Sequence, residues 1–137
     1  MDTSMLVPMH IKEVNSALAD DFIASVVEQV VVSDYAAGEF ASVIARLVRT
    51  RQVDADAGRI LLSDFDSWCA TDARRVATEA PDIRLASAMV RDVAIPLQMP
   101  DAVHAAASRR LGATLVTLDQ QLARAARAMN VDVFVPS

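Results

Sequence analysis

The chain has 137 residues, of which 53% are hydrophobic and 23% charged, and this balance excludes a disordered chain and predicts one globular domain over residues 1–137. No apolar run approaches the about 18 residues that a membrane span requires, and no secretory signal is visible, so we expect a cytoplasmic protein without membrane contact. The net charge of −5 argues against a protein that holds nucleic acid by positive charge alone, and the single Cys69 excludes an internal disulfide.

The first half of the chain predicts mainly helices around one buried strand. A polar opening is followed by an apolar run, and apolar residues then recur at helical spacing, with Val14 and Ile60 among the positions expected to be buried. Asp54 is placed to cap the last helix of this half. The expected elements are a helix over about 13–26, a strand over 27–32, a helix over about 34–51 and a helix over about 55–69.

The second half predicts strands and helices in alternation, after a stretch at about 71–80 that we leave unassigned. The expected elements are a helix over 82–92, a loop over 95–99, a helix from Pro100 to Gly112, a strand over 114–118, a helix over 120–129 and a last strand over 131–135. Such alternation predicts an α/β fold with a mostly parallel central sheet and helices on both faces, in three layers.

The helix that starts at Pro100 and the strand after it have matching lengths. About ten helical residues rise ~15 Å, and about five strand residues rise ~16 Å in return. Asp101, at the start of the helix, and Asp119, at the end of the strand, are therefore expected at the same edge of the sheet. Open α/β sheets bind ligands at that edge.

Four acidic residues each follow a strand or open a helix: Asp2, Glu39, Asp101 and Asp119. Without them, 14 of the 18 acids remain against 13 Lys and Arg, so the excess negative charge is concentrated in this set. Carboxylate oxygens are hard ligands that suit Mg²⁺ or Mn²⁺, and we expect one or two such ions. The sequence has no nucleophile elbow, P-loop or Cys/His zinc spacing that would indicate a different chemistry.

Each acid also has a structural explanation. Asp101 suits the helix dipole, Asp119 suits an N-cap, and Glu39 could pair with Arg46 or another arginine. Asp34 is a further acid near a strand end, which either adds to the set or caps a helix.

Several segments, in this order and spacing, resemble a PIN-domain ribonuclease, and most closely the small single-domain toxins of bacterial VapBC modules. The matching segments are Asp2-Thr3-Ser4 before an apolar run, Glu39 early in a helix, Pro100-Asp101-Ala102-Val103-His104-Ala105-Ala106-Ala107, and Thr114–Asp119 before Leu122-Ala123. The resemblance implies a PIN-like three-layer fold, Mg²⁺- or Mn²⁺-dependent hydrolysis of RNA to 5′-phosphate and 3′-hydroxyl ends, and a cognate antitoxin that blocks the site.

Matched by motif, Asp2, Glu39, Asp101 and Asp119 take the positions of the family's acidic metal-binding and catalytic residues. The resemblance gives Thr3, Ser4 and Thr117 the role of donors that orient these carboxylates. His104, one turn after Asp101, recurs in the family motif without a catalytic role. Arg124 and Arg127 either contact RNA phosphates or belong to a solvated face.

The chain departs from the family at its first strand, because only Met1 precedes Asp2. We therefore expect a truncated first strand, unless residues 3–7 compensate. Apolar helices over 13–26 and 34–69 exceed what one small core can hide, and we expect a homodimer or an antitoxin to cover the excess. The function expected is a toxin endoribonuclease acting on RNA, for which tRNA is one candidate; the alternative is a catalytically weakened PIN scaffold that binds protein or RNA.

Overall fold

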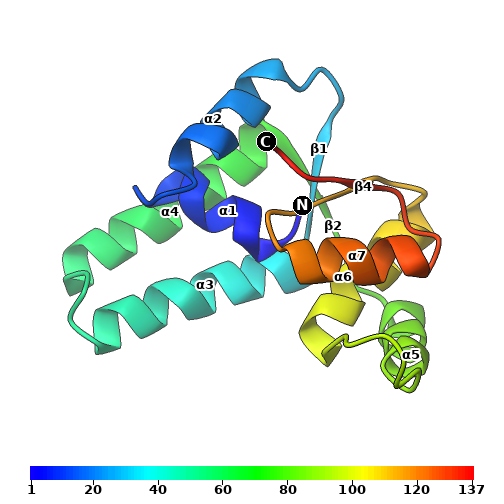
Figure 1. Cartoon of the computed structure of the whole chain (residues 1–137). Helices are drawn as coiled ribbons and strands as arrows, with labels where there is room; N and C mark the ends of the chain where they lie inside the picture. The colour runs from blue at the N-terminus through cyan, green and yellow to red at the C-terminus, as the bar shows by residue number, and fades with distance from the viewer.

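The computed structural model describes residues 1–137 and contains seven helices and four short strands (Figure 1). In chain order these are α1 (Thr3–His10), α2 (Ser16–Ser25), β1 (Val30–Ser33), α3 (Asp34–Arg49), α4 (Ala55–Thr71), β2 (Ala73–Val76), α5 (Ala80–Met89), α6 (Met99–Leu111), β3 (Leu115–Val116), α7 (Gln120–Ala128) and β4 (Val133–Phe134). None of the helices combines the length and apolar character needed to cross a membrane.

The strands form two parallel ladders, β1 with β2 and β3 with β4. The first two residues of the chain lie between the ladders and connect them. The Met1 ammonium donates to the Val31 carbonyl at 2.9 Å, and the Asp2 N–H donates to the Val116 carbonyl at 3.2 Å. Figure 1 accordingly shows the N-terminus in the middle of the molecule. The expected truncated first strand is therefore a two-residue segment between β1 and β3.

Each ladder has its own hydrophobic core. One core packs α1, α3 and α4 against β1, with Leu6, Val32, Phe40 and Phe65 almost fully buried. The other packs α5, α6 and α7 against β3, and five of its twelve buried residues are alanines from α6 and α7. Because alanine has a short side chain, these helices can approach closely, and their packing sets the positions of the residues at their N-termini.

Three expectations for the first half are wrong in detail. Residues 3–7 begin helix α1 and do not extend the sheet. The next helix starts only at Ser16. The Ser16 hydroxyl accepts from the Glu13 N–H and donates to the Pro8 carbonyl. Val14 therefore lies in a turn, and 92% of its surface is exposed. Ile60 is 60% exposed, because the buried side of α4 carries Phe65 and Cys69.

The expected strand over 27–32 lies further along the chain, at Val30–Ser33, and Val27 is 95% exposed. The unassigned stretch 71–80 contains β2, which pairs with β1. Other boundaries agree with the sequence to within a few residues. Asp54 caps α4 by accepting from the Ala57 N–H at 2.8 Å, and Gly112 ends α6 with a positive φ of 59°, which glycine adopts without strain.

Candidate functional site

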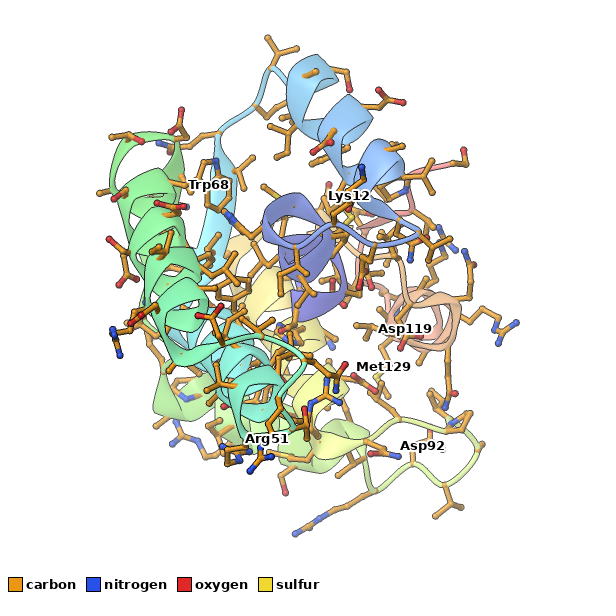
Figure 2. The ribbon with its side chains drawn as sticks, turned by 90° about the vertical axis from the view of Figure 1, so that its left-hand side faces the viewer. Lys12, Arg51, Trp68, Asp92, Asp119 and Met129 are labelled. Atoms are coloured by element: carbon orange, nitrogen blue, oxygen red, sulfur yellow. The ribbon has the colours of Figure 1, made fainter.

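Asp101 and Asp119 lie at the two ends of the segment formed by α6, β3 and the turn between them. Asp101 is in the first turn of α6, after Pro100, and Asp119 follows β3 and opens α7 (Figure 2). The Asp119 Oδ1 atom accepts from the N–H groups of Gln121 and Leu122 at 2.7 and 2.9 Å, so Asp119 is the N-cap of α7. Its Oδ2 atom has no hydrogen-bond partner in the protein, so one oxygen supports the helix and the other is free.

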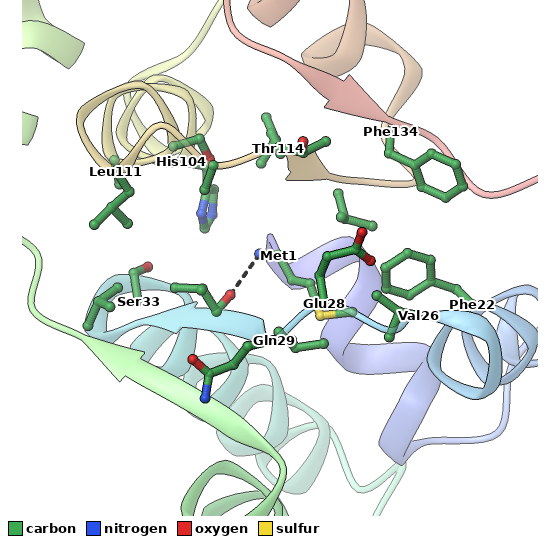
Figure 3. A pocket seen from close by; sticks show the side chains of 18 of the residues that line it. Met1, Phe22, Val26, Glu28, Gln29, Ser33, His104, Leu111, Thr114 and Phe134 are labelled. Atoms are coloured by element: carbon green, nitrogen blue, oxygen red, sulfur yellow. Dashed lines mark hydrogen bonds between the residues drawn. The ribbon is translucent and has the colours of Figure 1, made fainter.

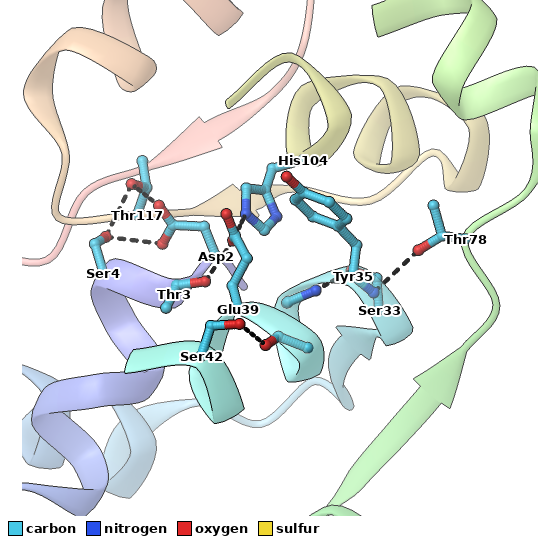
Figure 4. Close-up of polar contacts among 12 residues, drawn as sticks. Asp2, Thr3, Ser4, Ser33, Tyr35, Glu39, Ser42, Thr78, His104 and Thr117 are labelled. Carbon is cyan, nitrogen blue, oxygen red and sulfur yellow. Dashed lines mark hydrogen bonds and ion pairs between the residues drawn. The ribbon is translucent and has the colours of Figure 1, made fainter. Parts of the chain in front are cut away.

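Asp2 is buried, with 4% of its surface exposed, between α1 and the end of β3. Its Oδ1 accepts from the Ser4 hydroxyl at 2.8 Å and its Oδ2 from the Thr117 hydroxyl at 2.7 Å (Figure 4). The Thr117 hydroxyl in turn accepts from the Asp119 N–H at 3.0 Å, which links the two acids through one side chain. Burial raises the pKa of Asp2, and the hydrogen bonds from Thr117 and Ser4 oppose that rise.

Glu39 lies in the N-terminal half of α3 and is held by two donors. The Thr3 hydroxyl and the His104 Nε2 each lie 2.6 Å from Glu39 Oε2, and the ring of Tyr35 packs edge-on against His104 at 5.4 Å (Figure 4). Burial alone would raise the pKa of Glu39, but the bonds from His104 and Thr3 outweigh it and lower that pKa. Oε1 of Glu39 has no partner in the protein.

The Asp101 carboxylate makes no hydrogen bond in the protein, and its surroundings are acidic. Burial raises the pKa of Asp101, and the negative charges of Asp119, Asp2 and Glu39 raise it further, whereas His104 acts in the opposite direction. Acids from three other segments thus act electrostatically on Asp101. A shared field of this kind favours the binding of a cation that would relieve the repulsion.

The donor set suits a divalent cation, although the side chains are not closed around one. No three acidic, histidine or cysteine side chains stand close enough together to hold an ion in the present arrangement. Both oxygens of Asp101 and one oxygen each of Asp119 and Glu39 are unpaired, and the Asp2 oxygens each keep a lone pair beyond the one bond that they accept. Since the Asp101 carboxylate has no hydrogen bond in the protein, a change of its rotamer would break none.

The remaining residues singled out from the sequence lie outside this cluster. Asp34 pairs with Arg75 at 2.8 Å and neither joins the other acids nor caps α3, whose N-cap is Ser33. Arg124 and Arg127 are exposed on α7 and form no ion pair with the acids; Arg127 contacts the Val133 carbonyl at 3.4 Å. Their contact with RNA phosphates stays a prediction.

Sequence reasoning missed the partner of Glu39. A pair with Arg46 or another arginine was the structural alternative for Glu39, but the structure pairs Glu39 with His104, which is only 5% exposed. His104 lies three residues after Asp101 and therefore on the same side of α6, which was the available signal. The histidine contacts a carboxylate of the candidate site directly, so it takes part in the arrangement of that site.

Comparisons with known proteins place the chain in a family. A family model described as the PIN domain matches residues 1–128. Two solved structures resemble this chain. VapC20 of Mycobacterium tuberculosis, described as a sarcin-ricin loop cleaving toxin, has a TM-score of 0.71 and 20% identity, and the match covers 90% of this chain and 92% of that chain. FitAcB of Neisseria gonorrhoeae has a TM-score of 0.77 and 17% identity, and the match covers 97% of this chain and 94% of that chain. No curated protein matches the sequence significantly.

The family match also explains the architecture. Parallel strands, helices on both sides and a mixed α/β order agree with the α/β fold expected from the sequence, and the two solved structures share it over nearly their whole length. The model match begins at Met1 and extends through α7, so it includes all four acids of the cluster. The chain therefore belongs to the PIN-domain family.

Proposed function

We propose that this protein is a divalent-metal-dependent endoribonuclease and the toxin of a toxin–antitoxin pair, acting in the cytoplasm. The observation that supports the proposal is the surroundings of Asp101: burial and the charges of Asp119, Asp2 and Glu39, which come from three other segments, raise its pKa. Membership of the PIN-domain family supports a nuclease, and the resemblance described above implies that these acids hold divalent ions.

In the proposed reaction, Asp2, Glu39, Asp101 and Asp119 hold one or two Mg²⁺ or Mn²⁺ ions. The metal, when bound, supplies water activation and neutralises charge that develops on the phosphodiester. Ser4 and Thr117 fix the orientation of the Asp2 carboxylate, as hydroxyl donors on both of its oxygens.

Glu39 is held in a similar way. Thr3 and His104 both donate to Oε2, which leaves Oε1 as the oxygen that would bind the ion. Asp101, unpaired and at the N-terminus of α6, is the carboxylate that moves to complete the site. Because Asp119 also caps α7, its position is fixed by the backbone of that helix and not by its own rotamer alone.

One structural neighbour supports a proposal for the substrate class. VapC20 is described as cleaving the sarcin-ricin loop, and we propose a structured RNA for this protein too, with a loop of ribosomal RNA or tRNA as the candidates. Arg124 and Arg127 are the exposed cations on α7 that we assign to phosphate contacts. A cognate antitoxin and a homodimer are part of the proposal, since apolar side chains such as Val14 and Ile60 are exposed.

The test is cleavage of a structured RNA by the purified protein in the presence of Mn²⁺, with the ends of the products sequenced. The Asp101→Asn variant is expected to lose cleavage while keeping its fold, as judged by circular dichroism. Asp20→Asn is the matched control, because Asp20 is exposed on α2 and is not among the acids whose charges raise the pKa of Asp101. Cleavage by Asp101→Asn at the wild-type rate would reject the assignment of this acid.

The second candidate is a PIN scaffold that binds protein or RNA without cutting it. It is favoured by one observation, the absence of three ligands already gathered around an ion position. RNA that is retained by the protein but stays intact at millimolar Mn²⁺ would support this candidate over the nuclease.

A further inference from the structure

Tyr35 is the one tyrosine of the chain, and it lies beside the candidate site. It is the second residue of α3 and stands one turn before Glu39, on the same face of that helix. Its backbone N–H donates to the Thr78 hydroxyl at 3.1 Å, and its ring packs edge-on against His104 and against the core of α5, α6 and α7 (Figure 4). The position of the phenol is therefore fixed by its backbone and by its ring.

The contact between the Tyr35 and His104 rings supports the histidine. His104 also lines a cavity of about 560 Å³, together with residues of β1 and β3, so its ring borders open space as well as packed side chains (Figure 3). Removal of the Tyr35 ring would leave His104 with more room to move, and Glu39 would lose a fixed partner. A test of the Tyr35 hydroxyl must therefore keep the ring, and phenylalanine does so.

The Tyr35 hydroxyl makes no hydrogen bond in the protein, although two acids act on it. Burial raises the pKa of Tyr35, and the negative charges of Glu39 and Asp101 raise it further. The phenol therefore keeps its proton at neutral pH, and its O–H is a donor without an acceptor in the protein. The Asp101 carboxylate also lacks a partner, so the two groups feel each other's field but are not bonded to each other.

Four other donors beside the acids are already engaged. The hydroxyls of Thr3, Ser4 and Thr117 each donate to one of the acids, and His104 Nε2 bonds to one as well. Carboxylates only accept hydrogen bonds, so they repel the anionic oxygens of an RNA phosphate. A phosphate that enters the site therefore needs a protein donor for an oxygen that no metal ion holds. The O–H of Tyr35 is neutral, fixed in position and unengaged, and it meets this need.

We propose that the Tyr35 hydroxyl binds the substrate, by donating to a non-bridging oxygen of the phosphodiester that is cut. This role rests on the proposed nuclease function and adds a residue to it. Charge builds up on the phosphodiester during cleavage, so a donor at this oxygen binds the transition state more strongly than the ground state. Loss of the hydroxyl should therefore lower kcat more than it raises KM.

Two structural roles for Tyr35 lead to different expectations. A tyrosine that only supports His104 with its ring can be replaced by phenylalanine without loss of activity. A tyrosine whose hydroxyl serves Asp101 would act through a metal ligand, so phenylalanine would weaken Mn²⁺ binding. A donor to the phosphate alone gives slower cleavage at unchanged Mn²⁺ affinity.

The test compares Tyr35→Phe with wild type on an RNA that wild type cleaves in the presence of Mn²⁺. We expect kcat to fall by about tenfold or more, while KM and the calorimetric Mn²⁺ affinity stay within about threefold of wild type. The melting temperature should not change, because the hydroxyl has no bond in the protein. Ser67→Ala, which removes an exposed hydroxyl of α4, should match wild type throughout. An unchanged kcat in Tyr35→Phe, or a parallel loss of Mn²⁺ affinity, would overturn the proposal.

Sulfur substitution in the RNA tests the contact from the side of the substrate. Sulfur in place of one non-bridging oxygen at the cleaved bond is a poor hydrogen-bond acceptor. For one of the two isomers, we expect the slowing caused by sulfur to be about fivefold smaller in Tyr35→Phe than in wild type, because the variant has no donor to lose. Equal slowing of both proteins on both isomers would overturn the proposal. A wild-type protein that cleaves no RNA would instead reject the proposed function, and this role of Tyr35 with it.

Discussion

Replacing Asp101 by asparagine should affect two quantities differently: the stability of the metal-free protein and its affinity for a divalent metal. Burial and the neighbouring acids raise the pKa of Asp101, so the native state binds this proton more tightly than the unfolded state. Its contribution to stability therefore falls as pH rises from the unfolded pKa through the folded one, and at neutral pH the charge destabilises the metal-free protein. Asparagine removes that charge. We expect the metal-free Asp101→Asn variant to be no less stable than wild type.

Added Mn²⁺ should stabilise the wild-type protein more than the Asp101→Asn variant. A ligand present at ten times its dissociation constant stabilises the native state by about 1.4 kcal/mol. A chain of 137 residues has an unfolding entropy of about 0.29 kcal/mol/K, from about 2.1 cal/mol/K per residue. The melting temperature of the wild-type protein should thus rise by about 5 °C at that Mn²⁺ concentration. The Asp101→Asn variant should show little of this rise.

The assay is thermal unfolding, followed by circular dichroism at neutral pH over a series of Mn²⁺ concentrations, with EDTA as the reference. Asp20→Asn removes the same charge from an exposed position of α2 and should keep the full rise. The reasoning is refuted if Asp101→Asn responds to Mn²⁺ as wild type does. It is also refuted if wild type shows no rise while the RNA is cleaved with the same metal.

Two further predictions concern the histidines. His104→Leu should weaken Mn²⁺ binding by about 10–100-fold in calorimetry, because Glu39 loses the donor at 2.6 Å. His104→Gln keeps an N–H donor and should retain most of the wild-type affinity. Equal affinities of the two variants for Mn²⁺ would contradict this role of His104. His10 is packed against Phe40, Phe65 and Trp68 with its Nε2 unpaired, and burial lowers its pKa. Since the unfolded chain then binds the proton more tightly, stability should be lost as pH falls below the unfolded value of about 6.5, by at most about 1.4 kcal/mol per pH unit. His10→Leu should lose less stability than wild type between pH 7.5 and 5.5 in urea denaturation, and equal losses would contradict the assignment.

Local signals in the sequence predicted the segments around α6 well. Pro100 and Gly112 mark the ends of one helix, as expected. The strand after it is shorter than the expected 114–118 and covers only Leu115–Val116, so the equal rise of helix and strand was wrong in detail. The charge of Asp119 nevertheless acts on Asp101, which agrees with the assignment of both acids to one edge. Asp54 was identifiable as a cap for a similar reason, since a cap depends on residues within one turn.

Contacts between distant segments could not be predicted in this way. Glu39 and His104 are 65 residues apart, and nothing in the local pattern of α3 distinguishes a histidine partner from an arginine. Ile60 and Val27 are apolar but exposed, because burial depends on which neighbouring element covers a residue and not on its own side chain alone. The strand β2 has the sequence Ala73-Arg74-Arg75-Val76, whose charged centre conceals its pairing with β1.

The position of the first residue has a practical consequence for handling the protein. The Met1 ammonium donates a hydrogen bond to the Val31 carbonyl of β1, in the middle of the fold, whereas Ser137 is exposed. A purification handle attached at Met1 would start between the two ladders, directly beside Asp2, whose carboxylate belongs to the candidate site. The same handle attached after Ser137 extends directly into water and leaves the interior unchanged.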